Sequence, residues 1–343
     1  MRKIVICLIL LCAVMIPTFV QAQGCMGGGD EEGVSLMGFL QTQYENKQKT
    51  EESTFTFNRA RLGVVGNIPY DISYYMFMEY SPFKDNSPYL LDAFITYSRL
   101  NPYLKVSMGQ FKSPFSMERN TSCSGLHTVN RSVVVEELAM DRDIGILFYG
   151  DYKKLISYKL GIMNSTGRGV KDDNKVKDYV GRLILSPFDW IKAGGGFRFG
   201  KAVPAVDGAD DDERNRYSAE LEVNKGNILL QAEYLFGEDI GSYTTGGGCG
   251  GEPLVVHQGT VERNGYFIQA LYMTPWNLQP VFKFETYDAD LDKDDNTQNI
   301  MTFGFNYFLN EWTRIQANYL YCAEPGNEVD NDQILIQLQA LIR

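Results

Sequence analysis

About sixteen segments of roughly ten residues, in which apolar and polar side chains alternate, constrain the fold more than any other feature of the sequence. Over residues 54–68, Ala60 and Leu62 fall on one face of such a segment, and Arg59 and Arg61 fall on the other. Segments of this length suit strands that cross a bilayer at a tilt. The pattern predicts an all-β fold: a 16-stranded antiparallel transmembrane β-barrel with apolar side chains toward lipid and polar side chains toward a water-filled lumen.

Short and long connections strictly alternate between these segments. A soluble β-sandwich, the main alternative fold, would not need this alternation. We place the long acidic or glycine-rich connections, including residues 237–264, on the outer side. The short connections are tight turns of the periplasmic rim, at Pro69, Asn101, Gly150, Pro187, Lys225, Pro275 and Asn310.

The chain begins like an exported protein. Arg2 and Lys3 precede an apolar run, and Val20-Gln21-Ala22 is a small-residue cleavage site. We therefore expect residues 1–22 to be a signal peptide and residues 23–343 to form the barrel in the bacterial outer membrane, in contact with lipid and lipopolysaccharide. A lipoprotein attached through Cys25 is an alternative. No later stretch has the roughly eighteen apolar residues of a spanning helix.

The charge of the chain narrows its partners. The formal net charge is −11, and the acidic residues crowd into segments between the predicted strands. This balance argues against nucleic acid as a partner, since nucleic-acid-binding surfaces are basic.

One connection is far longer than the usual loop. The alternating pattern stops at Lys112 and resumes at Asp143, after roughly thirty residues. We expect this segment, about residues 113–142, to fold inward and narrow the channel.

Several motifs resemble the phosphate-selective porin O and P family. They are GQFKSPFSME (residues 109–118), NRS (130–132), RDIG (142–145), FNRARLGVVG (57–66), LLDAFITYS (90–98), GRL (181–183) and GYFIQALYMTP (265–275). The resemblance implies a passive porin, assembled as a homotrimer, that passes small inorganic anions such as phosphate. It also implies that the ends of the long loop are anchored to the wall, through Gln110, Lys112, Arg142 and Asp143.

Strand parity and the long loop supply candidate cations for an anion path. The candidates are Arg59, Arg61, Lys105, Lys112, Arg119, Arg131, Lys159, Arg182, Lys192, Arg198, Lys283 and Arg314. A cation-rich lumen favours anions even in an acidic chain, because the field inside a low-dielectric wall depends mostly on nearby charges. The alternative is that these cations pair with lumen acids such as Glu79 and Glu220, and we expect Arg131 and Arg142 to be structural partners of acids.

The sequence gives little support for catalysis, and we expect no catalytic residue, cofactor or bound metal. The two histidines, His127 and His257, fall in predicted loops. Residues 288–299 begin like a calcium loop but have Lys293 where glycine is required, which excludes an EF-hand and leaves only a loose divalent cation between loops. Cys25, Cys123, Cys249 and Cys322 have no metal-ligand spacing, and their disulfide pairing stays open.

Two other functions remain open. A general or cation-preferring porin would share the same barrel. The acidic outer loops favour the alternative in which the lumen cations only pair with acids, since these loops would repel incoming anions. An outer-membrane barrel without an open lumen, either an enzyme or an adhesin, would share the strand pattern but conduct no ions.

Overall fold

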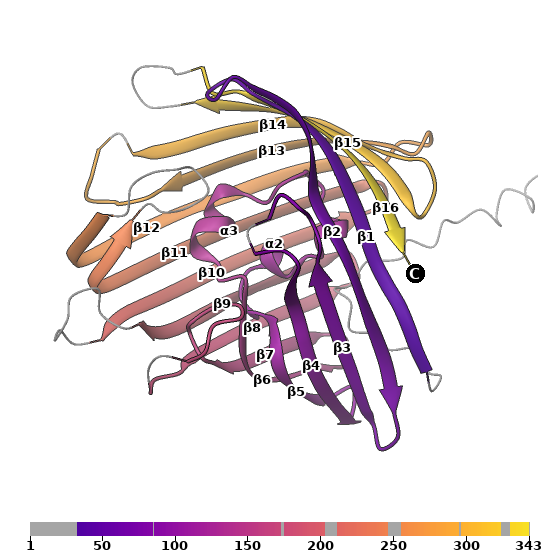
Figure 1. Cartoon of the computed structure of the whole chain (residues 1–343), viewed down its shortest axis with the longest axis vertical. Coiled ribbons are helices and arrows are strands. Elements are labelled where there is room, and N and C mark those ends of the chain that lie inside the picture. Colours follow the sequence, from indigo (N-terminus) through magenta and orange to yellow (C-terminus); the bar gives the residue numbers. More distant parts are fainter. Residues whose placement is uncertain are drawn as a thin grey trace, which may run out of the picture.

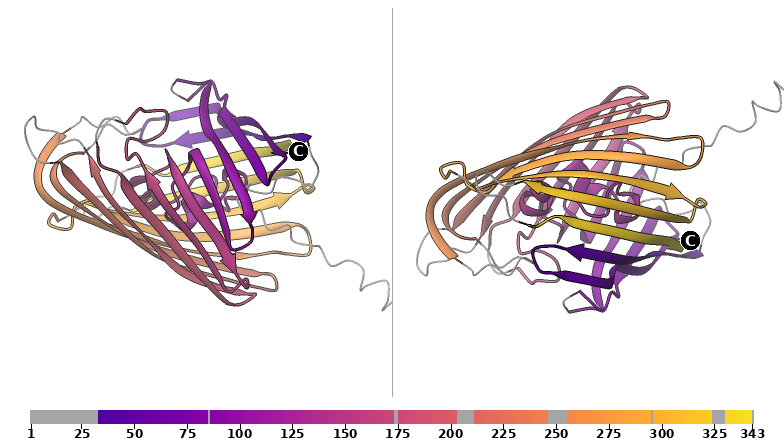
Figure 2. Two further views of the ribbon diagram at one scale, coloured as in Figure 1. Left: turned by 90° about the horizontal axis from the view of Figure 1, so that it is seen from below. Right: turned by 90° about the horizontal axis from the view of Figure 1, so that it is seen from above.

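The computed structural model describes residues 33–84, 86–172, 175–202, 211–245, 255–294, 296–323 and 330–342. Within these ranges the chain forms a closed antiparallel barrel in which each strand pairs with the next in sequence (Figures 1 and 2). The barrel closes where β1 (Gly33–Lys47) pairs with β16 (Gln333–Ile342), from Gly38↔Ile342 to Lys47↔Gln333. The predicted all-β, 16-stranded barrel is therefore confirmed, while the predicted signal peptide lies outside the described residues.

The strands differ considerably in length. β11 and β12 have 18 residues each, whereas β3 and β7 have 8. The strands between β1 and β16 are β2 (Glu52–Ile68), β3 (Ile72–Glu79), β4 (Tyr89–Leu100), β5 (Leu104–Lys112), β6 (Arg142–Tyr152), β7 (Ile156–Met163), β8 (Asp178–Phe188), β9 (Ile191–Ala202), β10 (Asp212–Lys225), β11 (Ile228–Thr245), β12 (Val255–Tyr272), β13 (Leu278–Asp288), β14 (Thr297–Phe308) and β15 (Thr313–Ala323).

Alternation of side chains along each strand separates a lipid face from a lumen face. In β16, Ile336 and Leu338 are 44% and 48% exposed, whereas Gln337 and Gln339 are buried. Because successive residues of a strand point to opposite faces, the aliphatic side chains cover the outside and the amides line the inside.

A β-bulge interrupts the pairing of β1 with β2. Gln41 pairs with Arg59 and Thr42 pairs with Phe57, so Asn58 has no partner of its own in the ladder. Both side chains at the bulge point inward: Asn58 donates to Gln337 at 3.0 Å, and Arg59 donates to Gln41 at 2.9 Å.

One predicted loop is largely strand. The β11–β12 ladder continues from Gly237↔Arg263 to Thr245↔Val255, so most of residues 237–264 extends the barrel wall. Residue 257, which the sequence places in a loop, is in β12. Glycine-rich sequence permits this because the ladder is made by backbone groups, and the two strands support one another beyond the membrane.

The short turns after β2, β4, β6, β8, β10, β12 and β14 lie at one rim of the barrel, as predicted, although Gly150, Pro187 and Lys225 belong to β6, β8 and β10 and the turns follow them. The predicted strict alternation of short and long connections is wrong at β1 and β2, whose connection, residues 48–51, is equally short but lies at the other rim. We assign this rim to the periplasm, since barrels of this kind have short periplasmic turns and longer outer loops. In the described part of the chain, no helix is both long enough and apolar enough to cross a membrane.

Candidate pore constriction

The segment between β5 and β6 lies inside the barrel (Figure 1). It contains α2 (Met117–Asn120), η1 (Cys123–Gly125) and α3 (Val133–Leu138), and α3 packs against β11, β12 and β13. The predicted inward-folded loop is therefore confirmed. We call residues 113–141 the constriction loop.

Apolar contacts hold the constriction loop against the wall. Phe115, Val134 and Val135 of the loop are fully buried and pack with wall residues that include Leu235 of β11 and Phe267 of β12. Burying each such side chain contributes about 1.5–3 kcal/mol. These wall residues point inward, where a water-filled lumen would call for polar side chains, so the barrel interior here is shaped to receive the loop.

Polar contacts fix both ends of the loop. Arg142 forms two hydrogen bonds of 3.0 Å with Asp92 of β4, in the bidentate geometry that favours Arg–carboxylate pairs. Asp143 accepts hydrogen bonds from the backbone N–H groups of Ile144 and Ser165. Gln110 donates to the carbonyls of Leu90 and Leu91. Lys112 bonds within the loop, to the carbonyl of Thr121 at 3.0 Å.

The middle of the loop is tied to the opposite wall by two carboxylates. Lys283 Nζ of β13 lies 2.9 Å from Glu118 Oε1, and Ser132 donates to Glu118 Oε2 through both its N–H and its hydroxyl. Burial opposes ionisation of Glu118, but the Lys283 ammonium and these hydrogen bonds outweigh burial and lower the pKa of Glu118. The second carboxylate, Glu233 of β11, accepts hydrogen bonds from the N–H groups of Met117 and Glu118 at 2.7 and 3.0 Å.

Side-chain amides connect the loop to the wall of β14 to β16 and β1. Gln41 donates to the carbonyl of Cys123, and Gln316 donates to the carbonyl of Leu126, at 3.1 and 3.2 Å. Asn306 donates to the carbonyl of His127 at 3.0 Å. The amides also bond to one another: Gln337 donates to Gln316, Gln316 to Asn306, and Gln41 to Gln339. We call these six residues the amide lattice: Gln41, Asn306, Gln316, Gln337, Gln339 and Asn318, whose Oδ1 accepts from the N–H of Val129.

A buried cysteine lies on the side of the loop that contacts the amide lattice. Cys123 Sγ lies 3.1 Å from Arg61 Nη1 and 3.3 Å from Arg131 Nη2. Burial would raise the pKa of the Cys123 thiol, but the nearby guanidinium groups of Arg131 and Arg61 outweigh burial and hold this pKa well below its usual value. Arg61 also pairs with Glu79 at 2.8 Å.

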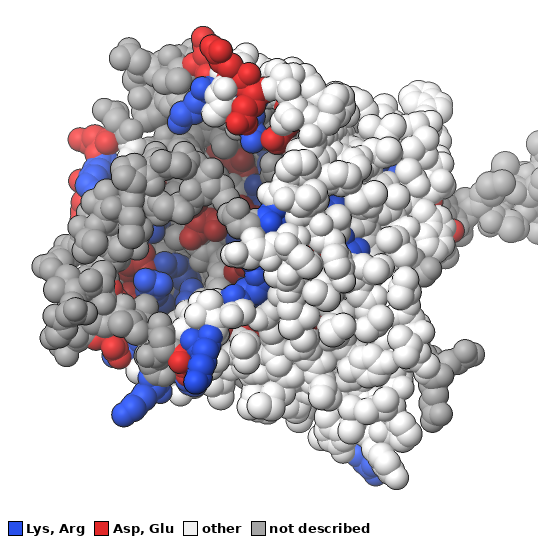
Figure 3. Space-filling view, viewed as in Figure 1, with Lys and Arg blue, Asp and Glu red and all other residues white. Residues whose placement is uncertain are grey.

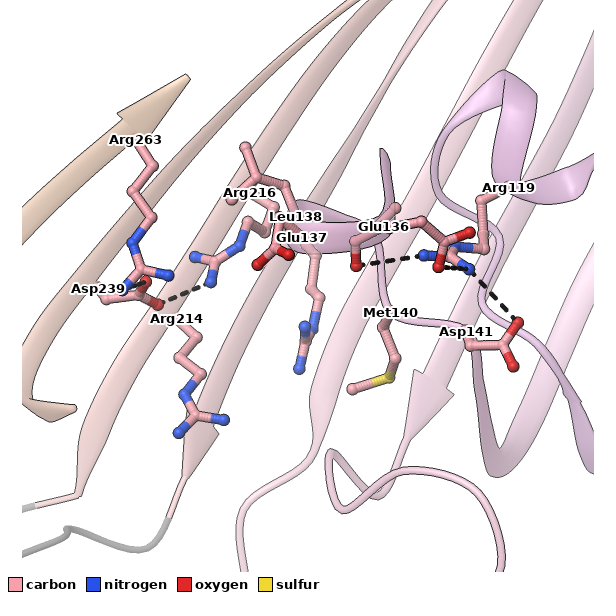
Figure 4. A pocket seen from close by; sticks show the side chains of 12 residues that line it. Arg119, Glu136, Glu137, Leu138, Met140, Asp141, Arg214, Arg216, Asp239 and Arg263 are labelled. Atoms are coloured by element: carbon pink, nitrogen blue, oxygen red, sulfur yellow. Dashed lines mark hydrogen bonds and ion pairs between the residues drawn. The ribbon is translucent and has the colours of Figure 1, made fainter. Parts of the chain in front are cut away.

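A pocket of about 470 Å³ remains on the other side of the loop, along β9 to β12 (Figure 4). Figure 3 shows a hollow in which charged side chains gather, while the outer face of the barrel beside it is almost uncharged. The wall lines the pocket with Arg198, Arg214, Arg216, Asp239 and Arg263, and the loop lines it with Arg119, Glu136, Glu137, Leu138, Ala139, Met140 and Asp141.

Most of the pocket arginines are already engaged. Arg198 pairs with Asp178 at 2.5 Å, and Arg216 pairs with Asp239 at 2.8 Å. The side chain of Arg214 makes no hydrogen bond or ion pair with any described residue, and it extends into the pocket without a partner in Figure 4. This guanidinium is available to a solute.

The other lumen cations lie toward the rim of short turns. Arg182 forms a bidentate pair with Glu220 at 2.9 and 2.7 Å, and Lys192 lies 2.9 Å from Glu222. The remaining two have weaker contacts: Lys159 is 3.3 Å from Asn120 Oδ1, and Lys105 lies over the ring of Tyr149 at 5.8 Å.

The structure distributes the cations proposed from sequence over three environments. Only Arg119 and Arg198 line the pocket. Six candidates contact the loop, the amide lattice or buried acids: Arg59, Arg61, Lys112, Arg131, Lys283 and Arg314. Arg314 donates to Ser124 O at 2.7 Å and to Gln339 Oε1 at 3.1 Å. The last four candidates lie between the constriction loop and the rim of short turns: Lys105, Lys159, Arg182 and Lys192.

Sequence reasoning missed Arg214, Arg216 and Arg263 as candidates for the path. Arg263 falls within residues 237–264, which the sequence places in a loop, and Arg214 and Arg216 directly follow the acidic stretch of residues 207–213, which resembles a loop. The two-residue spacing of Arg214 and Arg216 is the signal that could have found them, because it puts both on one face of a strand that continues above the membrane.

No group of three or more His, Cys, Asp or Glu side chains is arranged to hold a metal ion within the described ranges. In the segment after β13, Lys293 Nζ lies 2.5 Å from Asp290 Oδ2. Cys123 and Cys322 form no disulfide within the described ranges, while Cys25 and Cys249 lie outside them.

Comparison with known proteins supports the porin reading. A family model described as phosphate-selective porin O and P matches residues 37–194, which contain all the motifs noted in the sequence except residues 265–275. No curated protein sequence matches the chain.

Solved structures share the fold at low sequence identity. An anion-selective porin from Comamonas acidovorans has a TM-score of 0.65 and 15% identity, covering 91% of this chain and 100% of that one. The outer membrane channel DcaP of Acinetobacter baumannii has a TM-score of 0.69 and 11% identity, covering 92% and 99%. OmpT, an outer membrane protein of Vibrio cholerae in trimer form, has a TM-score of 0.62 and 14% identity, covering 90% and 99%.

These structural likenesses establish the fold, and the family match shows a similarity in sequence as well. Family and fold indicate a channel of the bacterial outer membrane rather than an enzyme. The chain therefore has the fold of an outer membrane porin, and residues 37–194 are similar in sequence to the phosphate-selective porin O and P family.

Proposed function

We propose that this protein is a passive porin through which small hydrophilic solutes diffuse across the outer membrane, with small anions such as phosphate preferred. The observation that carries the proposal is the pocket beside the constriction loop, into which the wall directs Arg198, Arg214, Arg216 and Arg263. The solute gradient drives transport, so neither a cofactor nor a covalent step is required.

The physical basis of the preference is the local field. Protein and lipid around the pocket have a low dielectric constant, so nearby charges act on a permeating ion more strongly than the net charge of −11 does. Arg214 has no described partner and can offer its planar fork of donors to two oxygens of a phosphate or carboxylate.

The acids of the loop favour a second candidate, a general or cation-preferring porin. Glu136, Glu137 and Asp141 line the same pocket. Glu136 pairs with Arg119 at 3.1 Å, and Asp141 pairs with Arg142 at 2.9 Å. These pairs reduce the field that the loop presents to a cation.

Reversal potentials in planar bilayers under a salt gradient decide between the two candidates. We expect the sign of an anion-selective channel, and an Arg214→Gln variant should lower the anion-to-cation permeability ratio roughly two- to threefold, as one charge acting across several Å of water would. Lys105→Gln, which removes a lumen charge outside the pocket, is the matched control and should change the ratio less. A cation-selective sign in the unmodified protein rules out the anion preference.

A barrel without an open lumen, acting as an enzyme or adhesin, is excluded if the folded protein gives single-channel conductance. Complete absence of conductance from correctly folded protein would instead count against every porin reading.

We also propose that the mature protein begins after Ala22 and assembles as a homotrimer in contact with lipid and lipopolysaccharide. The trimer form of the Vibrio cholerae protein supports the assembly, and the exposed apolar side chains of the outer face, such as Ile95 and Met108, suit contact with lipid. Native mass spectrometry of protein extracted from outer membranes would test the mature N-terminus and the oligomeric state together.

A further inference from the structure

A short segment of the outer connection between β7 and β8 folds back across the barrel wall. We call this segment, residues 164–170, the strap. It follows β7 in the chain, yet it contacts side chains of β6, β5 and β4. Gly167 and Gly169 have φ values of +87° and +68°, which a residue with a Cβ atom rarely adopts, and they permit this reversal. The strap therefore lies at the outer ends of the two strands that carry the constriction loop.

Two of the predicted anchors of the constriction loop hold the strap as well. The backbone N–H of Ser165 donates to Asp143 Oδ2 at 2.5 Å, and the N–H of Gly169 donates to Gln110 Oε1 at 2.8 Å. Gln110 belongs to β5 and Asp143 to β6, the strands on either side of the loop. These hydrogen bonds fix the position of the strap relative to the constriction loop.

Arg168 connects the strap to the pocket beside the constriction loop. Its guanidinium carbon lies 3.9 Å from the centre of the Tyr89 ring, and its Nη1 lies 4.0 Å from Asp141 Oδ2. A guanidinium this close to an aromatic face is held both by electrostatic attraction and by stacking. Because Asp141 lines the pocket, the strap places a cation next to an acid of the permeation path.

Asp141 depends on this cation because its other arginines are shared with other acids. Arg142, 2.9 Å from Asp141, also pairs with an aspartate of β4. Arg119, 3.8 Å from Asp141, also pairs with Glu136 (Figure 4). Arg168 is not shared in this way, since Asp141 is the one acid among the described residues that lies within ion-pair distance of it.

From these contacts we infer that Arg168 is a specificity-determining residue of the channel. The side chain of Asp141 is 37% exposed where it lines the pocket. The charge of Arg168 opposes the charge of this acid and reduces the repulsion that a permeating anion meets there. The inference rests on the proposed porin function, and it adds to the path a cation from outside both the barrel wall and the constriction loop.

Reversal potentials of the assembled porin in planar bilayers under a salt gradient measure this effect. Arg168→Gln should lower the anion-to-cation permeability ratio roughly twofold, because one positive charge beside the path is lost. Lys171→Gln is the matched control, since it removes the same charge from an exposed residue of the same connection, and it should change the ratio less. Arg168→Lys keeps the charge and should stay close to the unmodified ratio.

A double variant separates the charge of Arg168 from a general loosening of the strap. Arg168→Gln combined with Asp141→Asn removes both charges of the pair, so the ratio should return close to that of the unmodified protein. A ratio that stays low in the double variant would overturn the inference, as would a fall in Lys171→Gln as large as the fall in Arg168→Gln. Heat-dependent mobility on gels shows that each barrel is folded before it is measured.

The proposed anion preference is judged separately. Its test is the sign of the reversal potential in the unmodified protein. The inference about Arg168 concerns the shift between variants, which can be measured whichever sign the unmodified protein has.

Discussion

Lys283 of β13 and Glu118 of the constriction loop meet across the lumen with 2.9 Å between Nζ and Oε1, and both side chains are buried. Replacing Lys283 with Met should leave the Glu118 carboxylate buried beside Glu285 without its cation. A buried ion pair that loses one partner typically costs about 3–5 kcal/mol. We expect a lower thermal unfolding temperature in detergent and noisier single-channel current, because the loop loses one of its ties to the wall.

The control for this change is Lys192→Met, which removes the lysine of a pair with Glu222 whose two side chains are 35% and 19% exposed. An exposed pair contributes about 1 kcal/mol or less, so this variant should unfold close to the unmodified protein. Equal loss of stability in the two variants would contradict the importance of the Lys283–Glu118 contact.

Gly109 should not tolerate a side chain. Its φ is +139°, and a Cβ atom there would lie 2.1 Å from the carbonyl oxygen of Ala93 on the neighbouring strand. Gly109→Ala should cost several kcal/mol, because both the backbone conformation and the packing against β4 must change. Gly161→Ala is the matched control, since its Cβ would meet only side-chain atoms, of Pro114 and Met163, none nearer than 3.3 Å. Heat-dependent mobility on gels, which separates folded from unfolded barrel, compares the two.

Cys123 should resist alkylation in the folded protein although its thiol pKa is lowered. Its side chain is 3% exposed, whereas Cys322 is partly exposed. With iodoacetamide and peptide mapping, we expect Cys322 to react first and Cys123 to react only after unfolding, because access limits the reaction more than thiolate formation does. Labelling of Cys123 at the same rate as Cys322 in folded protein would refute the buried position of its sulfur.

The Cys123 thiolate should also make stability depend on pH. Because Arg131 and Arg61 hold the pKa of the folded thiol well below the value of about 9 in the unfolded chain, the unfolded chain binds more protons between these two pKa values. Stability from this group therefore rises with pH up to about 9 and is lost as pH falls through the folded pKa. The difference in unfolding free energy between the unmodified protein and Cys123→Ser should widen with rising pH in that range.

His127 should destabilise the loop on acidification. Burial, together with the nearby Arg314 cation, lowers the pKa of His127 to about 4, so the imidazole is neutral in the folded protein at pH 7. The unfolded chain takes up a proton near pH 6.5, and stability should fall by about 1–3 kcal/mol between about pH 6.5 and about pH 4. Thermal unfolding measured against pH should have a smaller slope in His127→Gln, and an unchanged slope would exclude this histidine as the cause.

The alternation of apolar and polar side chains was sufficient to predict the barrel and many of the charged residues that face its lumen. Arg182 and Glu220, assigned to the lumen face from alternation alone, form a bidentate pair inside the barrel. This succeeds because a strand has only two faces, and lipid accepts just one kind of side chain on one of them.

The strands that extend beyond the membrane could not be delimited in the same way. Outside the bilayer both faces of a strand can be wet, so alternation fades at Arg214 and at Arg263, and those segments resemble loops. The pocket cations in these extensions therefore escaped a pattern-based search.

The docking of the constriction loop had no local signal either. Glu233 accepts from the backbone N–H groups of Met117 and Glu118, more than a hundred positions earlier in the chain. A contact of this kind depends on how the whole barrel closes, and nothing in the sequence around either partner announces it.

The amide lattice grips the main chain of the constriction loop rather than its side chains, at the carbonyls of Cys123, Leu126 and His127. A peptide carbonyl is the same for every residue type, so these hydrogen bonds do not depend on which side chain the loop carries. It is sensitive to length, because one inserted or deleted residue would shift each carbonyl away from its amide. Variation on this side of the loop should therefore be rich in substitutions and poor in insertions and deletions.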